Sequence, residues 1–249
     1  MEAEELVRAM TSRAERAGVF LDLDGTLAPI VPTPDLARVL PEVPEVLGRL
    51  AGKLAVVAIV SGRHSADIRS IVDVPGVAAV GTHGLEDEPP MAAEVLRATE
   101  EVAAALGAWV ERKGAAVAVH FRGLDDPLAA AAAAEPALVD LAAAHGLELL
   151  GGKRILELMP AGRPRKGGAV ERIVRERSLE AAMFAGDDVG DLDAFTALTR
   201  LRTEGVWTCA VIARGPETSD EVAAAADLAV DGPEGVVALL RQLAEALGP

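Results

Sequence analysis

The chain has 249 residues, of which 51% are apolar and 25% charged, and its formal net charge is −15. That much apolar material supports a folded core and argues against disorder. A strongly acidic protein repels nucleic acid and anionic membrane surfaces, so we expect neither as a partner. It would also repel a phosphorylated ligand at long range, so a site for such a ligand needs its own cations.

The cysteine content and the N-terminus indicate a location. The single cysteine, Cys209, excludes an internal disulfide and suits a reducing compartment. The first residues are acidic, unlike the basic start of a secretory signal. The sequence has no charge-free apolar run of about 18 residues, so we expect no membrane span. These features predict a soluble, cytoplasmic protein, which we expect to be a monomer.

Helix and strand patterns alternate in the first and last parts of the chain. In chain order we expect a helix over 1–17, a strand at 19–23, a loop over 29–44, a helix near 45–50, a strand at 54–60, a helix from 65, a strand at 77–80, a helix from 167, a strand at 181–185, a helix near 191–198, a strand at 207–213 and a helix over 233–247. Apolar strands that alternate with helices predict an α/β fold, with a parallel sheet covered on both faces.

The middle of the chain has a different pattern. It contains two alanine-rich helices with a strand at 115–121 between them, and strand material at 147–150 and 154–159. This order is typical of a small α+β domain. We therefore predict a domain over 89–160, inserted into a core formed by residues 1–88 and 161–249.

Polar side chains follow the predicted strands at their carboxyl ends, where open parallel sheets bind ligands. Asp22 and Asp24 follow the first strand, Ser61 follows the second, and Asp187 follows the strand at 181–185. Two carboxylates one residue apart are costly to place together unless a cation compensates them. Oxygen ligands of this kind suit Mg²⁺. The pattern therefore predicts a magnesium site at this edge of the sheet.

The same residues suit phosphoryl transfer. Asp22 can attack phosphorus to form an aspartyl phosphate, and Asp24 can protonate the leaving oxygen and later activate water. Ser61 and Lys166, the latter at a predicted helix start, can bind phosphoryl oxygens and stabilise their charge. Taken alone, each residue could be an ordinary turn, cap or surface residue. Their coincidence at matching strand and helix ends favours a phosphatase site.

These residues also carry a resemblance to a known family. The segment Asp22-Leu23-Asp24-Gly25-Thr26-Leu27 resembles the first motif of the haloacid dehalogenase superfamily. Ser61, Lys166 and Gly186-Asp187-Asp188 resemble its second, third and fourth motifs, in the correct order. Within that superfamily the chain resembles the trehalose-6-phosphate phosphatases over nearly its whole length. The supporting segments are Ser61-Gly62-Arg63, residues 81–86, the stretch from Glu111 to Arg122, and residues 156–162.

The resemblance implies a Rossmann-like core with a mobile α/β cap of the C2 type, inserted between the second and third motifs. It implies Asp22 as nucleophile and Asp24 as general acid and base. Mg²⁺ would be held by Asp22, by the Asp24 backbone carbonyl and by Asp187, with Asp188 and Asp191 beside them. The substrate-binding positions that it implies are Thr26, Gly62, Arg63, His83, Glu111, Lys113, Arg122 and Glu157. In one respect the chain departs from the family, because Gly190 and Leu192 replace the usual Thr and Glu of the fourth motif.

The implied activity is the Mg²⁺-dependent hydrolysis of trehalose 6-phosphate to trehalose and phosphate, a step of trehalose biosynthesis. Alternatives are a related phosphatase acting on sucrose phosphate or a glycosyl phosphoglycerate, and a phosphomutase of the same superfamily. A signalling receiver domain is disfavoured because such a domain is much shorter and has no cap. A non-catalytic sugar-phosphate binder is disfavoured because the set of acidic residues and lysine is intact.

Overall fold

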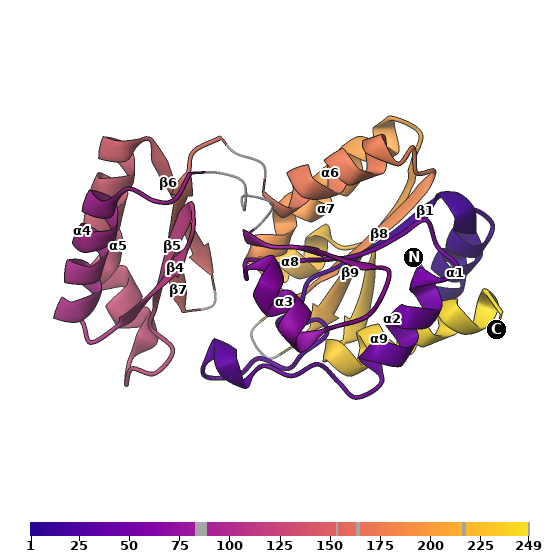
Figure 1. Cartoon of the computed structure of the whole chain (residues 1–249), viewed down its shortest axis with the longest axis horizontal. Helices are drawn as coiled ribbons and strands as arrows, with labels where there is room; N and C mark the ends of the chain where they lie inside the picture. Colours follow the sequence, from indigo (N-terminus) through magenta and orange to yellow (C-terminus); the bar gives the residue numbers. More distant parts are fainter. Residues whose placement is uncertain (83–88, 153, 163–164, 216–217, 249) are drawn as a thin grey trace. The chain divides into compact units, whose positions relative to one another are not determined.

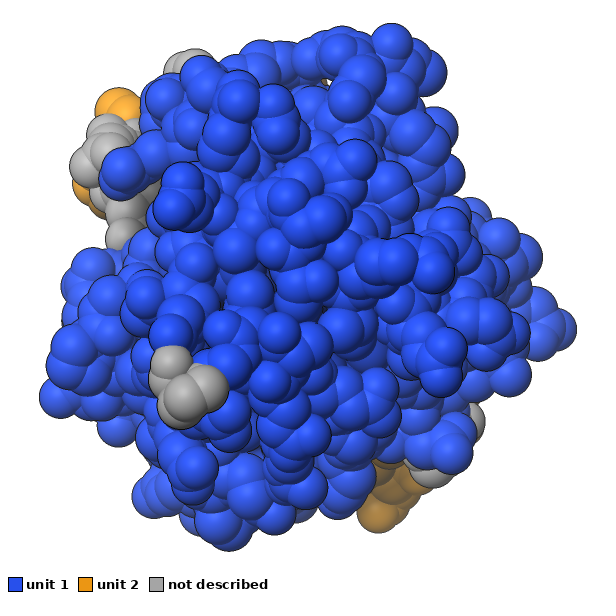
Figure 2. All heavy atoms as spheres, turned by 90° about the vertical axis from the view of Figure 1, so that its right-hand side faces the viewer, with its two compact units in different colours: residues 1–84, 165–249 blue, residues 85–164 orange. Residues whose placement is uncertain are grey.

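The computed structural model describes residues 1–82, 89–152, 154–162, 165–215 and 218–248 (Figure 1). The chain divides into two compact units. Unit 1 comprises Met1–Gly84 and Arg165–Pro249, and unit 2 comprises Leu85–Pro164; Figure 2 colours them blue and orange. Unit 2 is therefore an insertion between the two segments of unit 1. Each unit has its own sheet and core, and each is described by itself.

Unit 1 is built on a six-stranded parallel sheet with the order β10-β9-β8-β1-β2-β3. Its strands are β1 (Ala17–Leu21), β2 (Val56–Val60), β3 (Val77–Val80), β8 (Ala181–Gly186), β9 (Trp207–Arg214) and β10 (Leu228–Asp231). Strand β1 lies between β8 and β2, with Gly18 opposite both Ala182 and Val56. The carboxyl ends of these neighbouring strands therefore meet at one edge of the sheet.

Helices cover both faces of this sheet (Figure 1). They are α1 (Ala3–Thr11), α2 (Val43–Ala51), α3 (Ser65–Ile71), α6 (Lys166–Glu176), α7 (Leu192–Thr203), α8 (Asp220–Ala225) and α9 (Gly232–Ala246), with short 3-10 turns η1 (Ala14–Arg16), η2 (Pro34–Leu36) and η4 (Val189–Asp191). Because strand side chains alternate between faces, Val19 and Leu21 join a core cluster with α1, α2 and α9, whereas Phe20 joins one with α6 and α7. All three side chains are fully buried, which anchors β1 in the centre of the unit.

Unit 2 is a four-stranded antiparallel sheet with the order β4-β5-β7-β6. Its elements are α4 (Ala93–Ala105), β4 (Trp109–Lys113), β5 (Ala116–His120), α5 (Pro127–His145), β6 (Leu147–Gly152) and β7 (Ile155–Pro160). One face of the sheet, which includes Val117 and Leu158, forms a core with Val95 of α4 and Leu138 of α5. Residues that alternate with these in the strands lie on the opposite face.

Helix α5 is the one described helix that is long and apolar enough, by length and composition, to cross a membrane. Its hydropathy comes largely from alanine, and it also carries Glu135 and Asp140. Ala134, Leu138 and Ala142 are buried in the core of unit 2, so the helix has a packing role there. The absence of a membrane span stays a prediction.

The predicted fold class is confirmed, and the strands predicted for unit 1 are present with shifts of a few residues at their ends. The first helix is shorter than predicted, because α1 ends at Thr11 and a 3-10 turn leads into β1. Strand β1 ends at Leu21 rather than Leu23, since the Leu23 carbonyl accepts the N–H groups of Leu27 and Ala28 and closes a turn. Strand β4, helix α8 and strand β10 were not predicted.

Candidate active site

Asp22 is placed by the sheet itself. Its N–H donates to the carbonyl of Ala185 at 2.8 Å, so the residue continues the β1–β8 ladder by one step. The chain then turns through Gly25, whose φ of +87° is a conformation that favours glycine. A Cβ on Gly25 would lie 2.0 Å from Oδ2 of Asp187. Glycine therefore lets the loop after β1 touch the carboxylate that follows β8.

Lys166, the first residue of α6, forms a buried ion triad with two carboxylates. Its Nζ lies 2.8 Å from Oδ1 of Asp22 and 2.7 Å from Oδ1 of Asp191, and all three side chains are buried. Burial opposes the charge of Lys166, but Asp191 and Asp22 outweigh it and raise the lysine pKa well above its usual value. The lysine is therefore held in its charged form, next to the predicted nucleophile.

The surroundings of the Asp22 carboxyl disfavour its charged form. Burial raises its pKa well above the usual value; Lys166 opposes this, while the neighbouring Asp191 and Asp187 add to the rise. One ammonium does not offset this burial and the neighbouring negative charges. A further cation beside Asp22 would favour the ionised carboxylate, which is the form that can act as a nucleophile.

A metal ion fits this position. Asp22, Asp187 and Asp191 each offer a carboxylate oxygen, these atoms lie within 4.8 Å of one another, and all three residues are buried. Hard carboxylate oxygens suit Mg²⁺. Asp191 is already engaged, because its Oδ2 accepts the N–H groups of Asp187 at 2.8 Å and Asp188 at 3.1 Å. The donor set is therefore suited to a hard divalent cation, and the roles of Asp22 and Asp187 as its ligands stay predictions.

Two other predicted ligand residues have side-chain contacts of their own. The Asp188 carboxylate accepts the N–H of Gly190 at 2.8 Å and forms the capping box of the turn η4. The Asp24 carboxylate accepts two hydrogen bonds from Arg63, from Nε at 2.6 Å and from Nη2 at 2.8 Å. The predicted ligand was the Asp24 backbone carbonyl, and the metal-binding roles of both residues stay predictions.

The end of β2 brings Ser61, Gly62 and Arg63 to the same edge of the sheet. Ser61 is buried, and its Oγ accepts the Arg63 N–H at 3.3 Å. Arg63 also donates from Nη1 to the carbonyl of Pro34, which joins the loop after β1 to the loop after β2. The structure thus shows Arg63, predicted to bind substrate, in contact with the predicted general acid and base.

Thr26 has a buried hydroxyl without a hydrogen-bond partner among the described residues. Leaving a buried hydroxyl unsatisfied costs roughly 1–3 kcal/mol. A substrate oxygen that reached this hydroxyl would give it a partner. This supports the prediction that Thr26 contacts the substrate.

In unit 2, Glu111, Lys113 and Glu157 come together on one face of the sheet. Lys113 Nζ lies 3.7 Å from Oε2 of Glu111 and 3.4 Å from Oε1 of Glu157. His120 Nε2 donates to Oε2 of Glu111 at 2.9 Å. Burial would raise the Glu111 pKa, but the hydrogen bond from His120 and the charge of Lys113 lower it below its usual value. The Glu111 carboxylate is thus ionised and can accept hydrogen bonds, and the Lys113 ammonium beside it can donate them.

Two predicted substrate residues remain to be placed. Arg122 follows β5 at the start of the next turn and is half-buried. His83 lies outside the described residues, so its predicted role stays a prediction.

Sequence reasoning missed several contacts. Asp191 was expected only beside the metal ligands, yet it binds Lys166 directly. Asp193, expected only as an acidic residue beyond the strand end, accepts the N–H of Gly167 at 2.8 Å. In unit 2, Trp109 stacks on His120 with ring centroids 3.9 Å apart. The sequence did hold a signal for Asp191, because it lies four residues after Asp187. A turn of that length brings the second aspartate back to the end of the strand.

Comparisons with solved structures define the class of fold. A Candida albicans trehalose-6-phosphate phosphatase C-terminal domain has a TM-score of 0.85 at 22% identity, covering 98% of this chain and 97% of that one. A phosphatase of the haloacid dehalogenase superfamily from Bacteroides thetaiotaomicron has a TM-score of 0.62 at 16% identity, covering 92% and 96%. At these identities the likeness shows the haloacid dehalogenase fold.

Sequence comparisons then give the family. The sequence model of the trehalose-phosphatase family matches residues 20–230, so the chain belongs to that family. It is 34% identical over 252 residues to a trehalose-phosphate phosphatase of Mycobacterium avium, covering 92% of this chain and 62% of that protein. It is also 34% identical over 266 residues to an uncharacterized glycosyl hydrolase of Mycobacterium tuberculosis, covering 96% of this chain and 19% of that protein. The chain thus spans about three-fifths or less of the length of these relatives.

Proposed function

We propose that this protein is a Mg²⁺-dependent phosphatase that hydrolyses trehalose 6-phosphate to trehalose and phosphate. The observation that carries the proposal is the buried triad of Asp22, Lys166 and Asp191. Asp187 adds a third carboxylate, with an oxygen within 4.8 Å of those of Asp22 and Asp191. Membership of the trehalose-phosphatase family supports the substrate. In the same proposal, the protein acts in the cytoplasm.

The reaction is proposed to proceed in two steps. A carboxylate oxygen of Asp22 bonds to phosphorus as the phosphorus–sugar oxygen bond breaks, and Asp24 gives a proton to the departing sugar oxygen. Asp24 then takes a proton from water, which attacks the aspartyl phosphate, releases phosphate and restores Asp22. Arg63 holds the Asp24 carboxylate in one orientation through two hydrogen bonds, of 2.6 and 2.8 Å.

Lys166, Thr26 and Ser61 are proposed to support the transferring group. Lys166 keeps the Asp22 carboxylate in one orientation through the 2.8 Å contact between Nζ and Oδ1. The Thr26 and Ser61 hydroxyls are buried donors for phosphoryl oxygens. Mg²⁺, held by Asp22 and Asp187, would offset the negative charge of the phosphoryl group and the carboxylates.

Unit 2 is proposed to act as the cap that recognises the sugar. Glu111 and Glu157 can accept hydrogen bonds from sugar hydroxyls, and Lys113 can donate to them. The three side chains lie on one sheet face with contacts of 3.4 and 3.7 Å, so a sugar would meet alternating acceptors and donor. The two glutamates disfavour a second anionic group at this position.

The proposal of catalysis rests on the residues of the site, because the fold alone does not imply an enzyme. The C-terminal domain of a Candida albicans trehalose synthase regulatory protein shares the fold with a TM-score of 0.70 at 14% identity. The fold therefore occurs in a protein whose name describes regulation. The present chain has Asp22, Asp24, Lys166 and Asp187. Of these, Asp22, Lys166 and Asp187 are buried at one edge of the sheet.

The direct test is phosphate release from trehalose 6-phosphate, sucrose 6-phosphate, a glycosyl phosphoglycerate and p-nitrophenyl phosphate, with Mg²⁺ and with EDTA. We expect the highest kcat/KM for trehalose 6-phosphate and loss of turnover in EDTA. Asp22→Asn should lower kcat by more than about a thousandfold while leaving circular dichroism unchanged, because it removes the nucleophile with little change in size.

Each unfavourable outcome points to a different error. Preference for another sugar phosphate would contradict the substrate and keep the phosphatase. Unchanged turnover in Asp22→Asn would contradict the mechanism. Conversion of a reducing hexose 6-phosphate, added to the panel, into its 1-phosphate isomer without free phosphate would identify a phosphomutase.

A further inference from the structure

We propose that Asp193 is a positioning residue for Lys166: it fixes the first turn of α6 and thereby the place of the lysine ammonium. The inference rests on the role of Lys166 in the proposed function. Asp193 is the last acidic residue of the fourth motif, two residues after Asp191, and it is not a member of the metal cluster.

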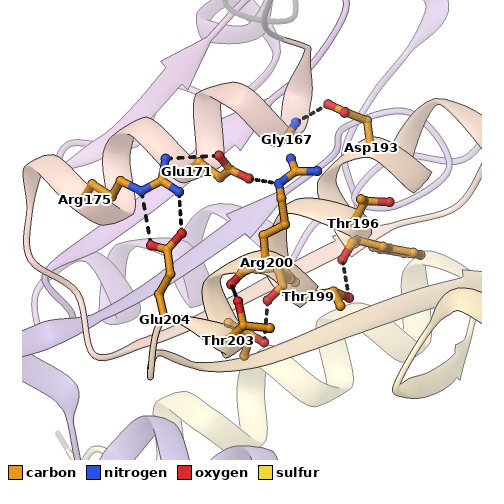
Figure 3. A network of polar contacts seen from close by, with 12 residues as sticks. Gly167, Glu171, Arg175, Asp193, Thr196, Thr199, Arg200, Thr203 and Glu204 are labelled. Carbon is orange, nitrogen blue, oxygen red and sulfur yellow. Dashed lines mark hydrogen bonds and ion pairs between the residues drawn. The ribbon is translucent and has the colours of Figure 1, made fainter.

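The first turns of α6 and α7 meet at this point. Lys166 and Gly167 are the first two residues of α6, and Asp193 is the second residue of α7. Oδ2 of Asp193 accepts the N–H of Gly167 at 2.8 Å (Figure 3). The first N–H groups of a helix have no partner within the helix, so a carboxylate from outside acts as their cap and also suits the positive end of the helix dipole.

The segment from Asp191 to Asp193 therefore holds α6 in two ways. Asp191 Oδ1 accepts from the Nζ of Lys166 at 2.7 Å, and Asp193 Oδ2 accepts from the backbone of the next residue. The short segment that leads from η4 into α7 thus fixes both the end of the lysine side chain and the backbone next to it. A shift of α6 along α7 would have to break both contacts.

Gly167 makes this contact possible. A Cβ at position 167 would lie 2.4 Å from the backbone oxygen of Asp193 and 2.7 Å from its Oδ2. Both distances are too short for real atoms, and the nearer atom belongs to the backbone, which cannot rotate away. The two helix starts therefore approach more closely than any other residue at 167 would allow.

Farther along, surface ion pairs also join the two helices. Glu171 of α6 pairs with Arg200 of α7, and Arg175 of α6 pairs with Glu204, just after α7 (Figure 3). The basic side chains of these pairs are about half exposed, so solvent screens both pairs. They provide a matched control, because they join the same helices without reaching the buried triad.

The test compares Asp193→Ala, Asp193→Asn and Arg200→Gln by steady-state turnover of trehalose 6-phosphate. Asp193→Ala should lower kcat about tenfold with KM changed less than twofold, because a small displacement of a positioned group slows chemistry more than binding. Asp193→Asn keeps an acceptor oxygen and should recover most of the rate. Arg200→Gln should match the unaltered protein. Equal kcat in Asp193→Ala and Arg200→Gln would overturn the proposal.

A second measurement separates positioning from general weakening. Orthovanadate, an analogue of the transferring phosphoryl group, is titrated by calorimetry into the unaltered protein, Asp193→Ala, Lys166→Met and the double variant. We expect Asp193→Ala to weaken binding severalfold when Lys166 is present and not at all when it is Met. Equal weakening in both backgrounds would overturn the proposal. Full activity of Lys166→Met would instead overturn the role of the lysine in the proposed function.

Discussion

Gly25 shows how far the site depends on one residue without a side chain. The loop after β1 and the carboxylate after β8 are in contact only because position 25 has no Cβ and tolerates a φ of +87°. The same glycine also donates its N–H to Ala28 at 2.7 Å, which closes the turn that carries Thr26. Gly25 therefore serves two purposes: it closes the turn, and it lets the loop contact the Asp187 carboxylate.

We predict that Gly25→Ala will lose most of its phosphatase activity. The left-handed backbone alone costs about 1 kcal/mol for an L-residue, and the new Cβ must displace the Asp187 carboxylate from 2.0 Å. Turnover of trehalose 6-phosphate and thermal unfolding measure the two effects. Gly205→Ala is the control, because φ there is +94° and nothing lies within 4 Å of its Cβ. Comparable losses of activity in the two variants would contradict a specific effect on Asp187.

At the scale of elements, the edge strand β4 supplies part of the polar face of unit 2, to which β5 and β7 also contribute. Trp109 and Glu111 alternate along it with Val110, and Trp109 pairs with His120 of β5. The Trp109 ring stacks on the His120 ring, which in turn donates to Glu111. An exposed aromatic ring is thus linked through a single side chain to a residue proposed to bind sugar hydroxyls.

This linkage predicts that Trp109 fluorescence responds to trehalose 6-phosphate. The chain has two Trp and no Tyr, so Trp207→Phe leaves Trp109 as the one indole. Binding of a sugar hydroxyl to Glu111 should alter the hydrogen bond from His120, and hence the surroundings of the indole. The titration uses the additional substitution Asp22→Asn to prevent turnover.

The matched control for this titration is Trp109→Phe, in which Trp207 of unit 1 is the reporter. We expect its emission to respond less than that of Trp109. A response of Trp207 alone would place the ligand away from the polar face of unit 2.

The same strand shows where sequence reasoning stopped. The strands of unit 1 were predictable because apolar runs such as Val56–Val60 are buried on both faces and need no partner to be recognised. The segment Trp109–Lys113 alternates charged and apolar residues at a sheet edge, and only its pairing with β5 makes it a strand. In the site, residue identities predicted the acidic cluster, whereas the capping of α6 by Asp193 depends on two helix starts that are far apart in sequence.

At the scale of the whole molecule, the two units have separate cores, and only unit 1 contains the residues proposed to bind Mg²⁺. The proposed Mg²⁺ ligands lie in unit 1, and the described apolar cores do not mix residues of the two units. Each unit also contains one of the two tryptophans, Trp207 in unit 1 and Trp109 in unit 2. Ligands of one unit should therefore stabilise that unit first.

We predict that Mg²⁺ will raise the unfolding temperature of unit 1 more than that of unit 2. A ligand at a hundredfold excess over its Kd stabilises the folded state by about 2.7 kcal/mol. Thermal unfolding is followed by Trp207 emission in Trp109→Phe and by Trp109 emission in Trp207→Phe, with Mg²⁺ and with EDTA. Equal shifts of both signals would show that the units unfold as one body, and no shift of either would contradict the metal site.

The interrupted layout of unit 1 has a consequence for how the protein forms. Strand β1 pairs with β8, so Ala17 must wait for Ala181 before the centre of the sheet can be completed. During synthesis, all of unit 2 emerges before β8 does, and its own strands pair only within Leu85–Pro164. A contiguous unit can fold while the first segment of unit 1 still has an open strand edge, and long-range pairing of this kind is slow. Asp22, the proposed nucleophile just after β1, therefore acquires Lys166, Asp187 and Asp191 as neighbours only after about three-quarters of the 249 residues have been made.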